Sequence, residues 1–204
     1  MQYPFTPIPQ SDSPKSALPA WQHLVDTYAS EINKVYSVWS QFSEAEMAYY
    51  PHPKSASVGE VLKHELLSGR RFFAEFLESP EPTPADVLPN ENTPAAFCKR
   101  LVELAQPRLG FLASRDEPWW LGATRFFDVD RQRIWIFWRR ILHTAHHRTQ
   151  LAVYLRLLDK PVPAIYGPTA DVSWEGADPT LTVEAASRGF SPQPTPAGVD
   201  KSPE

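Results

Sequence analysis

Residues 143–168 read HTAHHRTQLAVYLRLLDKPVPAIYGP and contain three histidines within five positions, at the head of an apolar stretch. No proline occurs between Pro118 and Pro161, and proline breaks a helix interior because it lacks the amide donor and clashes with the preceding turn. Apolar side chains recur across this gap at three- and four-residue steps, the period of an amphipathic helix. The sequence therefore predicts a long helix over residues 130–158 that carries the histidines.

Two other long proline-free stretches predict helices over residues 18–42 and 57–78, since both repeat apolar side chains at the helical period. The second opens with Ser57-Val-Gly-Glu60. This is the Ser-x-x-Glu pattern of a capping box, in which each of the two side chains bonds the backbone of the other residue.

A further helix is predicted over residues 93–114, with Pro94 in the first helical position, where proline is tolerated. Pro107 is expected to kink this helix or to end it early. No stretch shows the convincing alternation of apolar and polar residues that is typical of strands. The predicted fold is therefore all-α, and four long helices suggest a four-helix bundle.

The ends of the chain differ from its centre, so we expect one domain over residues 17–174. Residues 1–16 are rich in proline and serine, and residues 175–204 lack any sustained apolar period, so both ends are predicted to be flexible. The connection at residues 79–92 can span a helix when extended, at about 3.3 Å per residue against about 1.5 Å in a helix. Its length allows the next helix to run parallel to the last but does not require it.

Composition limits the partners and the compartment. The 204-residue chain is long enough to bury a core, and 42% of its residues are hydrophobic. Its formal net charge of -4 gives no general basic surface, so neither nucleic acid nor a membrane is expected as a partner. No apolar run approaches the roughly 20 residues of a membrane span, and the N-terminal residues lack the pattern of a signal peptide. The single cysteine, Cys98, excludes an internal disulfide and suits the reducing cytoplasm.

The histidines of the last predicted helix have the spacing of metal ligands. His143 and His147 lie one turn apart on one face, and His146 lies close to His143 on its other side. Either pair can chelate one ion, whereas His146 and His147 diverge by about 100° and do not easily join in one site. Thr144 replaces the glutamate of the zinc-binding His-Glu-x-x-His motif, so a protease of that class is not predicted.

His64 is the natural third ligand, because it lies at the edge of the apolar stripe of the helix predicted over residues 57–78. Three histidines with one open position form a catalytic arrangement for zinc, and imidazole also suits nickel, iron and copper. The alternative is structural, since a histidine that borders an apolar face is more often a hydrogen-bonded core residue.

Two stretches resemble DinB-like proteins. HTAHHRTQLAVYLRLLDKPVPAIYGPTAD is similar to the C-terminal pattern of that family, and SVGEVLKHELLSGRRFFAEFL is similar to its second helix. The resemblance covers about residues 18–171. It implies a four-helix bundle with a long crossover between the second and third helices.

The resemblance also implies a divalent metal ion, zinc, nickel or iron, held by His64, His143 and His147. It selects His147 over His146 as the partner of His143. It implies a homodimer, and it implies chemistry related to that of thiol-dependent S-transferases and a thiol-dependent isomerase in the wider superfamily.

Such a metal ion could act in two ways, because it lowers the pKa of a water or thiol bound at its open position. A low-molecular-weight thiol bound as thiolate could attack a small electrophilic substrate, which is the leading reading. Alternatively, a metal-bound water could hydrolyse an amide or ester with Glu60 as general base, although capping of the helix is the preferred role for Glu60. The third reading is a bundle that binds a metal or a small ligand without catalysis.

Four residues near the histidines are candidates for the pocket: His146, Gln150, Tyr154 and Arg140. Gln150 and Tyr154 continue the stripe of His143 and His147. Arg140 lies one turn before His143 and could hold an anionic substrate, with an ion-paired arginine as the simpler alternative.

Overall fold

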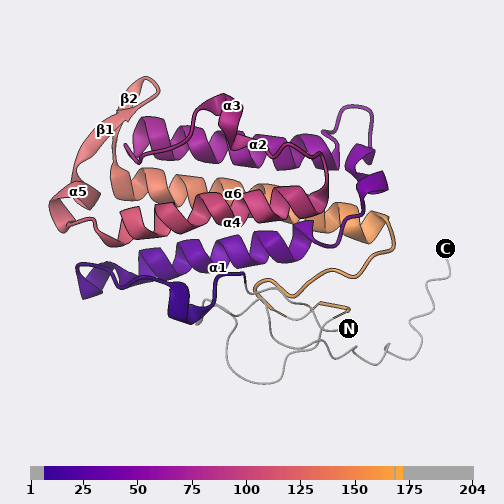
Figure 1. The fold of residues 1–204 in the computed structure, drawn as a ribbon, viewed down its shortest axis with the longest axis horizontal. Helices are drawn as coiled ribbons and strands as arrows, with labels where there is room; N and C mark the ends of the chain where they lie inside the picture. The colour runs from indigo at the N-terminus through magenta and orange to yellow at the C-terminus, as the bar shows by residue number, and fades with distance from the viewer. Residues whose placement is uncertain (1–6, 168, 172–204) are drawn as a thin grey trace, which may run out of the picture.

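The computed structural model describes residues 7–167 and 169–171, and it is mostly helical (Figure 1). Four long helices lie side by side: α1 (Gln22–Trp39), α2 (Val58–Arg71), α4 (Pro94–Ala113) and α6 (Arg133–Leu157). The prediction of an all-α fold is confirmed. A π-helical turn (Phe72–Phe76) continues α2. The shorter elements are α3 (Pro84–Val87), α5 (Glu117–Leu121) and three 3₁₀ turns (Gln10–Asp12, Pro19–Trp21 and Glu44–Ala48).

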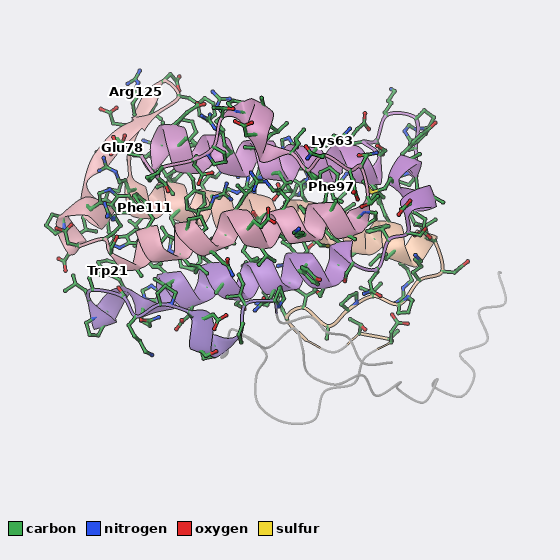
Figure 2. All side chains as sticks on the ribbon, viewed as in Figure 1. Trp21, Lys63, Glu78, Phe97, Phe111 and Arg125 are labelled. Carbon is green, nitrogen blue, oxygen red and sulfur yellow. The ribbon has the colours of Figure 1, made fainter. Side chains whose placement is uncertain are left out.

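The core lies between the long helices, where α1 packs against α4 and α6, and α2 packs against α6 and α4. Large side chains fill it, and Figure 2 shows Phe97 of α4 among the helices and Lys63 of α2 at the surface. Burial of such apolar surface is the main favourable contribution to folding. Among the described residues, no helix has both the length and the apolar character needed to cross a bilayer.

The capping box predicted at the start of α2 is confirmed. The Ser57 side chain accepts a hydrogen bond from the Glu60 backbone amide at 3.3 Å, and Glu60 Oε2 accepts one from the Ser57 amide at 2.7 Å. These bonds satisfy two of the backbone donors that a helix start leaves unpaired. They fix the first turn of the helix that carries His64.

The connection between α2 and α4 runs back along α2, with α3 on its way (Figure 1). It reaches α4 at the end of the molecule where α2 begins, so the two helices run parallel. Arg100 of α4 ties the connection down by donating to the backbone carbonyls of Asp86 and Val87.

Pro107 does not end α4, which continues to Ala113. The alternative of an early end is therefore wrong. Pro107 lies on the exposed face of the helix, where the backbone carbonyl that loses its partner can bond to water. Buried Leu104 and Leu109 hold the opposite face in the core.

The expectation that the chain has no strand is also wrong. Strands β1 (Ala123–Phe126) and β2 (Val129–Gln132) form an antiparallel hairpin before α6, which therefore begins at Arg133 and not near residue 130. All four residues of β2 are exposed, so the strand has no apolar alternation for sequence analysis to detect. Strand β1 is held by contacts outside the hairpin, because Phe126 packs on Phe72 and Phe76 of the π-helical turn.

The predicted flexible segment at residues 1–16 makes ordered contacts from Ile8 onward. Ile8 is buried, and its backbone amide and carbonyl both bond the side chain of Asn33 in α1, at 3.0 and 2.8 Å. Ser13 donates to Asp26 further along the same face. The predicted flexible tail at residues 175–204 lies outside the described residues.

A buried charge cluster joins α1 to α6 and to the segment that follows α6. Glu31 of α1 pairs with Arg148 and, at 3.1 Å, with Lys34. Tyr166 donates to the same carboxylate at 2.8 Å, and its ring lies 4.7 Å from the Arg148 guanidinium. One carboxylate thus serves two buried cations next to the helix turn that carries His147.

We expect Glu31→Gln to lower the free energy of unfolding by about 3–5 kcal/mol, because breaking a buried pair leaves uncompensated charge in the interior. Urea unfolding followed by circular dichroism measures this loss. The control is Glu44→Gln, at an exposed position, which should change stability by less than about 0.5 kcal/mol. Equal, small effects of both variants would contradict a stabilising role for the cluster.

Candidate metal centre

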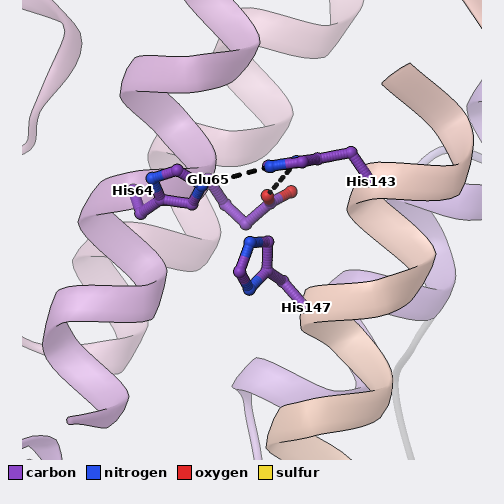
Figure 3. A group of neighbouring side chains, drawn as sticks. All are labelled: His64, Glu65, His143 and His147. Carbon is purple, nitrogen blue, oxygen red and sulfur yellow. Dashed lines mark hydrogen bonds and ion pairs between the residues drawn. The ribbon is translucent and has the colours of Figure 1, made fainter. Parts of the chain in front are cut away.

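Four side chains from two helices converge on one point (Figure 3). They are His64 and Glu65 of α2 and His143 and His147 of α6, and one ligand atom from each lies within 4.8 Å of the others. Nε2 of His64 is 3.2 Å from Nε2 of His143. The structure thus brings together the three histidines singled out in the sequence, across 79 positions of the chain.

The helices explain why these rings meet. One turn of α6 separates His143 from His147, so their rings lie 4.7 Å apart on the face that packs against α2. The His64 ring completes the group at 5.1 Å from His143 and 4.7 Å from His147.

Glu65 is the member of the group to which the sequence analysis assigned no role. Its side chain is buried, and its Oε2 accepts from Arg140 of α6 at 2.8 Å. Burial raises the pKa of Glu65, but the charge of Arg140 and the neighbouring His143 lower it by more, to about 2. The carboxylate is therefore ionised at neutral pH. The sequence did contain a signal for Glu65: a charged residue at an expected buried position of a helix, next to a histidine, often has a specific role.

Arg140 lies inside the protein and not on a substrate cleft. Besides the Glu65 carboxylate, it bonds the Glu65 backbone carbonyl at 3.1 Å and the Ser68 hydroxyl, and it approaches Nδ1 of His143 at 3.3 Å. Its guanidinium packs closely against Gly69, where a Cβ would lie at a contact distance of 3.4 Å from both Arg140 and Arg108. The guanidinium is therefore engaged by protein groups, as in the ion-paired alternative.

The donor set fits a divalent ion of the borderline-soft kind, because imidazole nitrogen and carboxylate oxygen both ligate zinc. One further observation supports the fit. Oε1 of Glu65 is buried and has no hydrogen-bond partner among the described residues, although Nδ1 of His143 lies only 3.0 Å away. The nearest polar neighbour of this oxygen is thus a candidate ligand, and a cation in the group would compensate the charge of the buried carboxylate.

The surroundings of two of the histidines favour the neutral imidazole, which is the form that binds a metal ion. Partial burial lowers the pKa of His64, and neighbouring histidines lower it further. Burial also lowers the pKa of His147, against the opposing effect of its hydrogen bond to Gln150. Both rings are therefore neutral at physiological pH, as metal ligation requires.

A cleft of about 520 Å³ opens beside this group. Its walls come from the loop before α2, from the first turns of α2 and from α6. The lining residues are Pro53, Lys54, Ser55, Ala56, Glu60, Val61, His64, His147 and Gln150. A cleft of this size, with polar groups at one end, suits a small molecule.

The other predicted site residues occupy different places. Gln150 lines the cleft, and Tyr154 is buried behind it. His146 is exposed and outside the ligand group, although its ring lies 4.9 Å from that of His147. Glu60 lines the cleft, but its hydrogen bonds from Ser57 lower its pKa, which makes it a weaker base.

Aromatic rings pack beside His143. The ring of Phe72, in the π-helical turn, lies 6.2 Å from that of His143, and Phe126 of β1 packs on Phe72 at 5.7 Å. π-Helical turns often occur at functional sites. The missed hairpin thus supports the ring beside His143.

Comparisons with known proteins identify the family and the fold. The chain matches the model of the DinB family over residues 13–177. The crystal structure of a DinB-like protein from Bacillus cereus ATCC 10987 has a similar fold, with a TM-score of 0.60 at 16% sequence identity, over 70% of this chain and 95% of the other. No protein of curated function matches. Since the family model covers most of its length, the chain belongs to the DinB family.

Proposed function

We propose that the protein is a divalent-metal-dependent enzyme that joins a low-molecular-weight thiol to a small electrophilic substrate. The observation that carries the proposal is the convergence of three histidines and an ionised carboxylate beside an open cleft. A divalent ion at this point would lower the pKa of a thiol in its open position. Thiol chemistry suits the reducing cytoplasm, which we propose as the compartment.

The residues of the chain supply the remaining requirements. His64, His143 and His147 offer nitrogen ligands, and Glu65 adds a negative charge that Arg140 balances. Lys54 and Ser55 place polar groups in the cleft, where they can orient a polar substrate. Access is direct, since His64 is exposed on the side of the cleft.

The cysteine of the chain lies away from this point, which favours an external thiol. This single cysteine, Cys98, lies on α4 and does not line the cleft. Burial raises the pKa of the Cys98 thiol to about 12, so the reactive thiolate is not populated at neutral pH.

Hydrolysis is the second candidate function, and the presence of Glu60 in the cleft favours it. A carboxylate near a metal site can act as general base toward water. We rank this function lower because Glu60 is engaged by Ser57. A protein that binds metal without catalysis is the third candidate.

A homodimer through α6 is part of the proposal. Five apolar side chains share one outer face of this helix, and three are more than half exposed: Leu142 at 64%, Leu157 at 56% and Val153 at 53%. Trp135 and Trp138 extend the same face. Aromatic residues are enriched in interfaces, and exposed apolar patches of this kind mark interaction sites.

Metal content tests the site first. We expect purified protein loaded with zinc to hold about one ion per chain, and His64→Ala, His143→Ala and His147→Ala each to lose most of it while staying helical. His146→Ala is the matched control, because this neighbouring histidine lies outside the group and should keep the metal. Elemental analysis after gel filtration gives the result. Equal metal content in all four variants would refute the assignment.

Turnover tests the reaction. The zinc-loaded protein should accelerate loss of glutathione or bacillithiol in the presence of an activated aryl chloride, and His147→Ala should abolish the acceleration. Cys98→Ala should retain it, since the buried cysteine takes no part. Cleavage of esters without thiol would instead indicate hydrolysis. Tight metal binding with neither thiol transfer nor hydrolysis would support the third candidate, a protein that binds metal without catalysis.

Light scattering tests the dimer. We expect wild-type protein to have twice the mass of the chain, and Leu142→Glu combined with Val153→Glu to have the mass of one chain, because a buried charge opposes association. Lys63→Glu on the exposed surface of α2 is the control and should stay dimeric. A wild-type protein with the mass of a single chain would exclude the proposed assembly.

A further inference from the structure

A chain of three hydrogen bonds starts at His147 and leads away from the candidate metal centre. Nδ1 of His147 lies 2.9 Å from Oε1 of Gln150. Nε2 of Gln150 donates to Tyr154 Oη at 2.8 Å, and Tyr154 Oη donates to the backbone carbonyl of Ala56 at 3.1 Å. The chain ends in the loop that forms one wall of the cleft.

The direction of every bond in this chain follows from its last member. The Ala56 carbonyl can only accept, so the Tyr154 hydroxyl must donate to it. The Tyr154 oxygen then accepts from the amide group of Gln150, and the carbonyl end of Gln150 faces His147. A carbonyl cannot donate, so Nδ1 of His147 carries the proton.

We propose that Gln150 and Tyr154 are positioning residues that hold His147 in the Nδ1–H tautomer. In that tautomer Nε2 carries a lone pair, and Nε2 is the nitrogen that points toward the other members of the group in Figure 3. The opposite orientation of Gln150 would place its amide hydrogens against Nδ1 and would direct an Nε2–H toward the ion. It would also leave the Ala56 carbonyl without the Tyr154 hydroxyl.

Packing holds the chain in place. Tyr154 is only 4% exposed, and its ring packs edge-on against that of Tyr49 at 5.9 Å. The Tyr154 hydroxyl therefore has little freedom to move, and it fixes the orientation of the Gln150 amide group. Outer partners of this kind commonly set the ring orientation and basicity of a metal-bound histidine.

The two ligands on α6 are supported in different ways. His143 lies beside the ionised carboxylate of Glu65, whereas His147 is held by the neutral amide of Gln150. The amide fixes the tautomer without adding a second negative charge to a group that already holds Glu65. This inference rests on the proposed metal site and assigns Gln150 and Tyr154 a role in it.

The tautomer can be measured without metal, by ¹⁵N–¹H correlation of the histidine rings in metal-free protein at about pH 8, above the ordinary histidine pKa. We expect His147 in the wild type to be Nδ1–H. Gln150→Leu should lose this tautomer and bind zinc about 10- to 100-fold more weakly. Tyr154→Phe, which keeps the ring against Tyr49, should reduce the Nδ1–H fraction with a smaller loss of zinc affinity.

Two further variants separate positioning from packing. Gln150→Glu should restore the Nδ1–H tautomer, because a carboxylate also accepts from Nδ1. Thr149→Ala, at the exposed neighbouring position, should change neither the tautomer nor zinc binding. Thermal unfolding of each variant verifies that the fold is intact.

An Nε2–H tautomer of His147 in the wild type would overturn the inference, as would an unchanged tautomer in Gln150→Leu. Failure of the proposed function has a different signature. A wild type that holds the Nδ1–H tautomer but binds no zinc would refute the metal site, while the hydrogen-bond chain would stand.

Discussion

The buried ion pair between Glu65 of α2 and Arg140 of α6 is the interaction on which the candidate site depends. It joins the two helices that carry the histidines, and it does so at the level of His64 and His143. Taking two charges out of water is costly, and the pair compensates only because further groups bond the guanidinium. Ser68, about one turn after Glu65, provides the additional acceptor.

The surroundings of the group are asymmetric. On one side the loop before α2 and the first turns of α2 form a polar cleft with Lys54 and Gln150. Beside His143, the packed rings of Phe72 and Phe126 are apolar. The cleft therefore offers access to the group from its polar side. Such a cleft would leave room for a substrate beside an ion held by the group.

The sequence predicted those parts of the structure that depend on period and spacing. The four long helices and the capping box at Ser57 follow from local patterns. Spacing left His146 and His147 as alternative partners of His143, and the resemblance selected His147. His64 was proposed as a ligand from its position at the edge of an apolar stripe, and the resemblance implied the same residue. What the sequence did not show depends on tertiary contacts. The hairpin is held by Phe126 against the π-helical turn that follows α2. Glu65 and Arg140 are buried as a pair that joins two helices.

The distance in sequence between His64 and His143 has a consequence for the order of folding. The loop closed by their contact spans 79 positions and includes the connection past α3, all of α4 and the hairpin. Closing so large a loop has an entropic cost, and contacts within single helices do not compensate it. The donor group therefore does not exist in any helical fragment of the chain and forms only when α6 docks on α2. An ion with affinity for the complete group stabilises the finished fold by mass action.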